Sequence, residues 1–363
     1  MPPVPLLTTS PTSAEVARKA GVSRTTVSFV LNDVRDRGIS EATRARVLAA
    51  ADELGYRPNI AARMLAGGAS ATVGLVMPQA AHLYDDVFLA HLVGSINEAC
   101  HRAGLKMLIE STDGEGREPG GFVDLVRSRR IDGLIVVNLR RSEHDHLRRI
   151  AAAGIPLVVL GSGRDGTGDF HTLGTDNHHG ATLAVNHLLD LGHRCIAHVG
   201  FAPPEFHSVC ERERGWRDAL AARGIVPELS WVAQADISAE SGWHATRVLL
   251  ARGVPFTALF VGNDTVAFGA LRALREAGRR VPDDVAVVGY DDLPLAPFAV
   301  PPLTSIRTDP AAHGREAMDL LLALMAGPGG AATHRDIGAA LVVRASSGAG
   351  RGAVDRPVLG CRT

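Results

Sequence analysis

Short apolar runs alternate with helical stretches along residues 72–289, and this alternation restricts the fold more than any other feature of the chain. The pattern occurs once before Gly168 and again after it. Continuous apolar strands separated by helices indicate parallel sheets that helices cover on both faces. The sequence therefore predicts an α/β core of two doubly wound parallel-sheet subdomains, with a ligand cleft between them at the carboxyl ends of the strands. The expected strands are 72–77, 105–110, 133–137, 156–160, 195–200, 257–261 and 285–289, and the expected helices are 87–103, 122–129, 143–153, 178–191, 216–223, 241–252 and 265–277.

A smaller α-helical unit precedes this core at residues 12–57. Its first helical pattern, residues 13–20, ends at Gly21, as helices often do. Ser23 is a suitable N-cap for a second helix, 24–32, and a third helix begins at Ser40. Two helices joined by a glycine-containing turn of about three residues have helix-turn-helix spacing. The sequence therefore predicts a helix-turn-helix head.

The second helix presents an exposed face opposite its apolar stripe of Val27, Val30 and Leu31. Arginine and hydroxyl side chains on such a face can donate hydrogen bonds to phosphates or base edges in the major groove. Phe29 has two interpretations, contact with a thymine methyl group or membership of the three-helix core. The candidate DNA-contacting residues of the head are Ser23, Arg24, Thr25, Thr26, Ser28, Phe29, Asn32 and Tyr56.

The strings EVARKAGVSRTTVSFVLN and ISEATRARVLAAADELGYRPNIAARML carry a family resemblance over residues 12–67. They resemble the DNA-binding head and hinge of the LacI/GalR family of bacterial regulators. That family usually has a base-reading arginine where this chain has Phe29. The resemblance therefore implies DNA binding but leaves the operator sequence open. The loop 33–38 also differs from the short turn of the family.

Residues 58–70 are expected to form a hinge, in which residues 60–66 form one short helix before Gly67. A helix of that length is unstable alone, since about 12–15 residues are marginal in water. The resemblance implies that two such helices pair across a dimer axis in the minor groove, with Leu65 wedged between base steps. A plain flexible linker is the alternative. The candidate contacts are Asn59, Ala62 and Leu65, and a ligand that shifts the core dimer then changes DNA affinity.

Later segments of the core, including TDNHHGATLAVNHLLDLGHRCIAHVG and ALFVGNDTVAFGALRALREAG, resemble the type I periplasmic-binding-protein fold that is the sensor core of the same family. In that fold the chain crosses between subdomains three times, here near 166–170, 296–300 and 328–338. The expected divisions are a disordered tail 1–11, the head 12–57, the hinge 58–70, an N-subdomain of 71–166 with 300–328, a C-subdomain of 169–297 with 338–346, and a tail 347–363.

Candidate ligand contacts come from the strand ends and from the resemblance. Arg212 matches the family arginine that binds ligand hydroxyls or a carboxylate, and Asn263 and Asp291 follow predicted strands. The alternative is that Asn263-Asp264 and Asp291-Asp292 cap the helices after them. Arginine, amide and carboxylate groups together suit a polyhydroxylated or otherwise polar ligand. Gly161 stands where sugar-binding members often have an acidic residue, which weakens the assignment of a sugar. Further candidates are Asp86, Phe88 and Thr308.

The histidines do not predict a metal site. His144, His146 and the pair His178-His179 lack the i, i+4 spacing of a helical zinc pair. The chain has neither a G-x-S-x-G elbow nor a P-loop, and an enzyme on this core would need a nucleophile or an acid–base set that the sequence does not offer. We therefore expect no cofactor, no metal and no enzymatic activity.

Charge is distributed unevenly along the chain. Residues 1–70 carry nine basic and six acidic side chains, although the whole chain has a net charge of −1. A basic head on an acidic body indicates that only the head contacts a polyanion such as double-stranded DNA. No run of about 18 apolar residues occurs, and the first ten residues lack the basic region of a signal peptide.

Together these features predict a cytoplasmic, ligand-responsive transcription repressor with no membrane partner. It is expected to bind a palindromic operator as a homodimer, with a tetramer as an open alternative, under the control of a small polar effector for which a sugar is favoured. The competing hypothesis is a solute-binding protein of the periplasmic type with no role on DNA.

Overall fold

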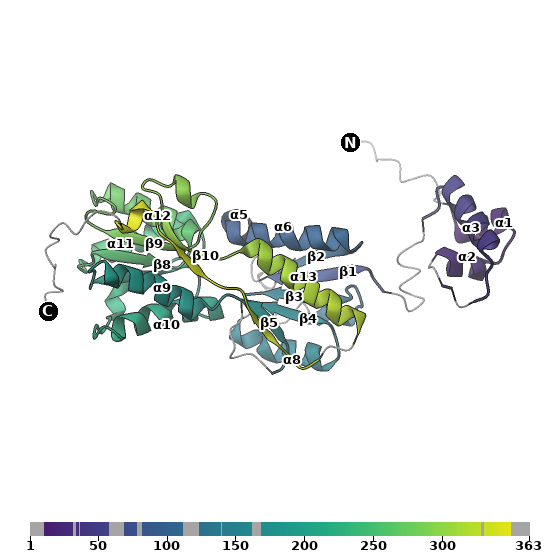
Figure 1. The fold of residues 1–363 in the computed structure, drawn as a ribbon, viewed down its shortest axis with the longest axis horizontal. Coiled ribbons are helices and arrows are strands. Elements are labelled where there is room, and N and C mark those ends of the chain that lie inside the picture. The colour runs from purple at the N-terminus through teal and green to yellow at the C-terminus, as the bar shows by residue number, and fades with distance from the viewer. Residues whose placement is uncertain are drawn as a thin grey trace. The chain divides into compact units, whose positions relative to one another are not determined.

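The computed structural model describes residues 11–31, 34–35, 37–57, 69–77, 82–111, 123–138, 140–161, 168–327 and 330–349. The chain divides into two compact units, Met1–Ser70 and Ala71–Thr363 (Figure 1). Among the described residues no helix has the length and apolar character needed to cross a membrane.

The head is a three-helix unit of α1 (Ser13–Ala20), α2 (Arg24–Leu31) and α3 (Glu41–Glu53). Thr12 and Glu15 form a reciprocal capping box at the start of α1, and Gly21 ends that helix in the left-handed conformation, with φ of 65°. The predicted helix-turn-helix is confirmed. Its core consists of small and branched side chains from all three helices, namely Val16, Ala17, Ala20, Val27, Val30, Val47, Ala50 and Ala51.

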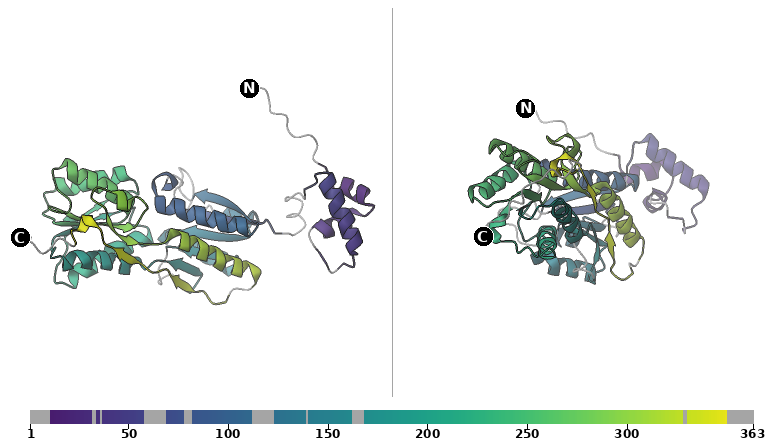
Figure 2. Two further views of the ribbon diagram at one scale, coloured as in Figure 1. Left: turned by 45° about the horizontal axis from the view of Figure 1, so that its top comes forward. Right: turned by 60° about the vertical axis from the view of Figure 1, so that its left-hand side comes forward.

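The N-subdomain is built on a parallel sheet of order β11-β5-β4-β3-β1-β2. Helices α6 and α13 pack side by side on one face of this sheet, as both Figure 1 and the turned view in Figure 2 show, and α7 and α8 cover the other face. Successive residues of β1 face opposite layers, with Leu75 toward α6 and Val76 toward α8. The strands are β1 (Thr72–Met77), β2 (Lys106–Ser111), β3 (Gly133–Val137), β4 (Leu157–Leu160), β5 (His171–Gly174) and β11 (His334–Asp336), and the helices are α5 (His82–Asp85), α6 (Val87–Arg102), α7 (Val123–Arg127), α8 (His144–Ala152) and α13 (Pro310–Ala326).

The C-subdomain repeats this arrangement around a sheet of order β12-β10-β9-β8-β6-β7, in which only β12 runs antiparallel to its neighbour. Helices α11 and α12 cover one face and α9 and α10 the other. The two doubly wound parallel-sheet subdomains are therefore confirmed. The strands are β6 (Ile196–Gly200), β7 (Val232–Gln234), β8 (Ala258–Val261), β9 (Ala286–Asp291), β10 (Thr304–Arg307) and β12 (Ala340–Val342), and the helices are α9 (Asn177–Asp190), α10 (His207–Ala221), α11 (Ala239–Ala251) and α12 (Asp264–Glu276).

Two of the three crossings between the subdomains lie later in the chain than predicted. Strand β5 belongs to the first sheet, so the first crossing follows Gly174 instead of lying near 166–170. Strand β10 belongs to the second sheet, so the second crossing follows Arg307 instead of lying near 296–300. Both strands are short and contain polar residues, and they therefore lack the continuous apolar run that identifies a buried strand. The third crossing joins β11 to β12, at the end of the predicted 328–338 (Figure 1).

The C-terminal boundary also differs from the expected one. A short 3-10 helix, Ala345–Ser347, buries the side chains of Ser346 and Ser347 against the second sheet. The Ser347 hydroxyl lies 3.0 Å from that of Thr304 on β10. Residue 347 therefore belongs to the core and not to the tail predicted for 347–363.

Candidate functional site

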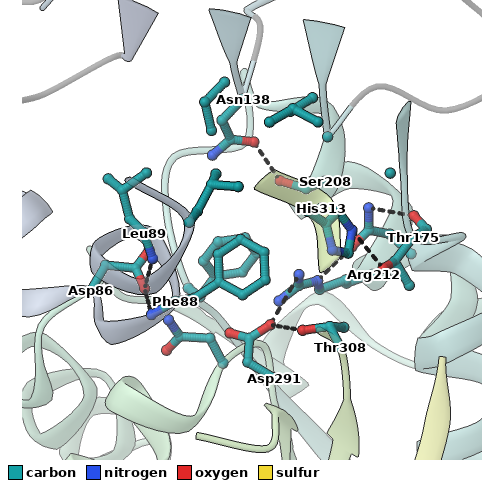
Figure 3. Close-up of a pocket in the computed structure, with 18 of the residues that line it drawn as sticks. Asp86, Phe88, Leu89, Asn138, Thr175, Ser208, Arg212, Asp291, Thr308 and His313 are labelled. Carbon is teal, nitrogen blue, oxygen red and sulfur yellow. Dashed lines mark hydrogen bonds and ion pairs between the residues drawn. The ribbon is translucent and has the colours of Figure 1, made fainter. Parts of the chain in front are cut away.

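A pocket that is open to solvent lies between the carboxyl ends of the two sheets, where the packing of parallel strands places strand-end residues together (Figure 3). All six ligand contacts predicted from the sequence line it, namely Asp86, Phe88, Arg212, Asn263, Asp291 and Thr308. The structure therefore brings together residues that lie far apart in the chain.

Arg212 on α10 is held firmly in the wall of the pocket. Its guanidinium carbon lies 3.6 Å from the ring centre of Tyr290 and 4.5 Å from that of Phe201. Its Nε donates a 2.8 Å hydrogen bond to Oδ1 of Asn177, and Nη1 donates to the carbonyl of Gly262. Because stacking and hydrogen bonds fix the planar group on several sides, Arg212 is oriented before any ligand arrives.

Asp291 ends strand β9 and provides the charge nearest to Arg212. Its Oδ1 lies 3.6 Å from Nη2 of Arg212 and 3.5 Å from the Thr308 hydroxyl. Burial raises the pKa of Asp291, and the charge of Asp86 raises this pKa further, whereas the Arg212 guanidinium opposes the shift. The backbone of Asp291 has φ of 104°, a conformation that is costly for a residue with a side chain and that is concentrated at functional sites.

Asn263 fulfils both of the interpretations that the sequence left open. Its Oδ1 accepts a 2.9 Å hydrogen bond from the Val266 backbone and so caps α12, yet its side chain also lines the pocket. The side chain is only 1% exposed, and its Nδ2 has no hydrogen-bond partner among the described residues. A buried amide donor without a partner costs free energy, so this atom is available to a ligand oxygen.

The carboxylates after Asn263 and Asp291 do not face the pocket and do not cap helices. Asp264 accepts hydrogen bonds from the Ser305 hydroxyl at 2.7 Å and the Leu293 backbone at 2.8 Å. Burial raises the pKa of Asp264 to about 7. Asp292 forms ion pairs with Arg307 at 2.7 Å and Arg344 at 2.6 Å. Capping by Asp264 and Asp292 is therefore wrong. Asp264 joins α12 to β10 and to the segment after β9, and Asp292 joins that segment to Arg307 and Arg344.

The N-subdomain side of the pocket is centred on Phe88, whose ring points into the middle of the cavity (Figure 3). Asp86 positions this residue, because its carboxylate caps α6 and accepts a 3.0 Å hydrogen bond from the Phe88 backbone. The Phe88 ring meets His313 edge-on at 5.9 Å. His313 also contacts two crossing segments, since it lies 3.1 Å from the Thr175 hydroxyl and donates from Nδ1 to the carbonyl of Asp309. Burial lowers the pKa of His313, so the ring is neutral at physiological pH.

Direct contacts also join the two subdomains across the pocket. The Ser208 hydroxyl on α10 donates a 2.8 Å hydrogen bond to Oδ1 of Asn138, the residue after β3. Beside this pair, Arg140 forms a 3.5 Å ion pair with Glu205. Gly161 lies next to Asn138, and a methyl group built on it would meet Asn138 Oδ1 at 3.6 Å. Gly161 therefore leaves space beside the Asn138 amide.

Several pocket residues were not predicted from the sequence. Asn138 and Thr175 directly follow β3 and β5, so the strand-end rule would find them once these ends are known. Phe201 directly follows β6 and would be found in the same way. Asn177, Ser208, Ile237 and His313 lie on loops or helices that offer no such signal.

The exposed face of α2 in the head carries the side chains predicted to contact DNA. Arg24, Thr25 and Ser28 are exposed. Ser23 caps α2 through a 3.0 Å hydrogen bond from the Thr26 backbone, and the hydroxyls of these two residues lie 2.9 Å apart.

The two aromatic candidates of the head differ in their surroundings. Phe29 is half-buried, lies outside the buried core of the head and has the Arg37 guanidinium 5.5 Å from its ring centre. Tyr56 packs against the core of the head. Four further candidates, Asn32, Asn59, Ala62 and Leu65, lie outside the described residues.

The described residues contain no group of three or more His, Cys, Asp or Glu side chains that could hold a metal ion.

Comparison with protein families gives two matches. Residues 12–59 match the model described as bacterial regulatory proteins, lacI family, and residues 185–347 match the periplasmic binding protein-like domain. The chain is 36% identical over 318 residues to the HTH-type transcriptional regulator CelR of Thermobifida fusca, and this alignment covers 86% of the chain and 91% of the relative. It is 32% identical over 312 residues to the HTH-type transcriptional repressor PurR of Photobacterium profundum, with the same coverage of 86% and 91%.

Solved structures show the same likeness over nearly the whole chain. A transcriptional regulator CelR–cellobiose complex matches with a TM-score of 0.68 and 33% identity, and a Lac repressor dimer bound to operator and the anti-inducer ONPF matches with a TM-score of 0.80 and 31% identity. Each match covers 93% of this chain and 99% of the other. The helix-turn-helix head and the periplasmic-binding-protein-like core are the two parts of a DNA-binding transcription regulator, and the chain belongs to the lacI family of bacterial regulatory proteins.

Proposed function

We propose that this protein is a cytoplasmic repressor that binds a palindromic operator as a homodimer and that a small polar effector in the core pocket controls its DNA affinity. The observation that carries the proposal is the pocket itself. It places Arg212, Asn263 and Asp291 of one subdomain opposite Phe88 of the other, beside the segments that cross between them. A ligand held by both subdomains favours one arrangement of the pair, which is what coupling to DNA requires.

A sugar is the favoured effector. Support comes from the likeness to the CelR–cellobiose complex and from the hydroxyl-binding character of the Arg212, Asn263 and Asp291 set. Gly161 argues only against the additional carboxylate contact and leaves these three groups in place.

Exposed apolar side chains support association with a second copy. Leu295, Phe298 and Val300 are 57%, 79% and 86% exposed on the loop between β9 and β10. A cluster of large apolar side chains in water is typical of an interaction surface. A relative of similar fold is described as a dimer on its operator, which is consistent with this assignment.

DNA binding is tested by gel shift of the full-length chain against an operator selected from random duplexes. The double variant Arg24→Ala/Thr25→Ala removes two exposed side chains of α2 and is expected to abolish the specific shift. Arg223→Ala, which removes a surface arginine paired with Asp190 in the core, is the matched control and should bind like the wild type. Retention of specific binding by the double variant would contradict the assignment of the head. A wild-type chain that selects no duplex would favour the solute-binding alternative.

The effector is sought by thermal-shift screening of the full-length chain against sugars, polyols and nucleosides, because a ligand that binds the native state raises its stability by mass action. A hit must also change the affinity for the selected operator. A ligand that stabilises the core and leaves DNA affinity unchanged would contradict the proposed control.

A further inference from the structure

The balance of charge inside the pocket restricts the effector more than its shape does. Among the described lining residues, formal charges belong to Asp86, Asp291 and Arg212, and His313 is neutral. Two acidic side chains therefore face one guanidinium, and the charge of that guanidinium favours the ionised form of Asp291 against the effect of burial. Asp86 lines the same pocket as Asp291, and the charge of Asp86 raises the pKa of Asp291. Asp291 therefore already supplies the anionic partner that a ligand would otherwise supply to Arg212.

Arg212 is also poorly placed to accept a second anion. One of its two terminal nitrogens donates to the Gly262 carbonyl and the other faces Asp291 at 3.6 Å. A phosphate or carboxylate at Arg212 would lie beside the Asp291 carboxylate, in surroundings where Asp291 is only 5% exposed. Like charges brought together under such burial repel strongly, because little water screens them.

The uncharged part of the pocket fits a molecule with an apolar face and a hydroxyl-bearing edge. The N-subdomain presents Phe88, Leu89 and Leu92, whereas the C-subdomain presents the unpaired Nδ2 of Asn263. That buried amide requires an acceptor oxygen, and the Asp291 carboxylate accepts from hydroxyl donors. A ring with carbon–hydrogen bonds on one face and hydroxyl groups at its edge satisfies both sides.

We propose, building on the effector role of this pocket, that it selects an uncharged polyhydroxylated molecule and rejects the phosphorylated or carboxylated form of the same molecule, with Asp291 and Asp86 as the residues that enforce the rejection. The pocket thereby binds the free sugar and does not bind the products of its phosphorylation or oxidation.

The test measures binding of matched pairs to the full-length chain by calorimetry. The probes are glucose, galactose, maltose and cellobiose, together with glucose 6-phosphate, galactose 1-phosphate, maltobionate and cellobionate. At least one neutral probe should bind, and its charged partner should bind at least about tenfold more weakly. Tighter binding of a charged partner, or binding of no neutral probe, overturns the proposal.

Two variants test whether Asp86 and Asp291 cause the rejection of charged ligands. Asp86→Asn removes one charge and keeps the cap of α6, because asparagine caps helices as well as aspartate does. It should reduce the discrimination between the neutral and the charged probe, measured as the ratio of their dissociation constants, by at least about threefold. Asp291→Asn should reduce the discrimination further, although it also weakens neutral binding. Asp284→Asn, the same substitution at a surface ion pair with Arg280, is the control and should leave the discrimination unchanged. Unchanged discrimination in both pocket variants overturns the role of the carboxylates.

Operator binding, measured in parallel, separates this proposal from the proposed function. A chain that binds its operator and prefers a charged sugar contradicts only the selection of neutral ligands. A chain that binds a neutral sugar and no duplex contradicts the repressor function and leaves the selectivity standing.

Discussion

The Ser208 hydroxyl and the Asn138 side chain join the two subdomains by a hydrogen bond of 2.8 Å in the wall of the ligand pocket. Ser208 belongs to α10 of the C-subdomain and Asn138 follows β3 of the N-subdomain. Each side chain holds the other in a position that faces the cavity. The contact therefore links the relative position of the two subdomains to the geometry of the pocket.

Ser208→Ala is expected to weaken effector binding about fivefold, because a net contribution of about 1 kcal/mol from one hydrogen bond to the closed state is lost. Calorimetry with the effector found by screening measures this change. Ser230→Ala, which removes an exposed hydroxyl distant from the pocket, is the control. Equal affinity of Ser208→Ala and the wild type would show that the contact does not contribute to closure.

Gly180→Ala is expected to disturb the support of Arg212. A methyl group at Gly180 on α9 would lie 2.2 Å from the Tyr290 hydroxyl oxygen, and the Tyr290 ring stacks on Arg212. Overpacking of this kind costs about 1–3 kcal/mol, and displacement of the ring also weakens effector binding. Denaturant unfolding and calorimetry measure the two effects.

A second substitution tests the cause of the Gly180→Ala defect. Tyr290→Phe removes the oxygen, which has no hydrogen-bond partner among the described residues, and should partly restore the stability of Gly180→Ala. Gly94→Ala is the control, because a methyl group there meets no atom within 4 Å and alanine favours a helix. A double variant no more stable than Gly180→Ala would place the clash elsewhere.

Asp264→Asn is expected to change how stability depends on pH. The pKa of Asp264 is raised to about 7 in the folded protein, so the native state binds this proton more tightly than the unfolded chain does. The associated stability is present below the ordinary pKa of an aspartate and is lost as pH rises toward 7. Asparagine does not titrate in this range. The difference in unfolding free energy between the wild type and the variant should therefore fall by at least about 1 kcal/mol between about pH 5 and about pH 8.

Denaturant unfolding at the two pH values measures the difference for Asp264→Asn. The amide keeps one acceptor oxygen for Ser305 or Leu293, so a constant loss of stability at all pH values is also expected. Asp284→Asn is the contrast, because the Arg280 guanidinium lowers the pKa of Asp284 and its stability contribution does not vary across this window. A pH-independent difference for Asp264→Asn would mean that Asp264 is ionised throughout.

Ser23→Ala is expected to destabilise the head by about 1 kcal/mol, because the Ser23 hydroxyl accepts the first hydrogen bond of α2 from the Thr26 backbone. Circular dichroism during thermal unfolding of the full-length chain follows the loss of head helicity. Ser23→Asp restores a capping oxygen and should recover the stability, although it adds a negative charge to the surface predicted to face DNA. Failure of the aspartate to recover stability would indicate a role other than capping.

The sequence predicted the fold class and the main pocket residues because both follow from local rules. Strand-end residues such as Asn263 and Asp291 meet at one edge of a parallel sheet whatever the loops do. The sheet membership of β5 and β10 was not predictable in this way. Their sequences, HTLG and TSIR, mix polar and apolar residues, and nothing in them indicates which of two neighbouring sheets supplies the hydrogen bonds.

His313 shows a different limit of sequence reasoning. It lies in the first turns of α13, a helix whose pattern identifies a buried face and nothing more. Its position in the pocket depends on the crossings at Thr175 and Asp309, which only the tertiary structure brings together. A histidine that contacts two crossing segments has the same local sequence as one that fills a core.

The stacking of Arg212 between Tyr290 and Phe201 has a consequence for the energetics of ligand capture. A flexible arginine in water loses rotamer freedom and its hydration shell each time it binds a ligand, and those losses reduce the affinity. Here folding has already removed both. A small ligand, with few atoms from which to gain affinity, would meet a donor that folding has already oriented and left only 8% exposed.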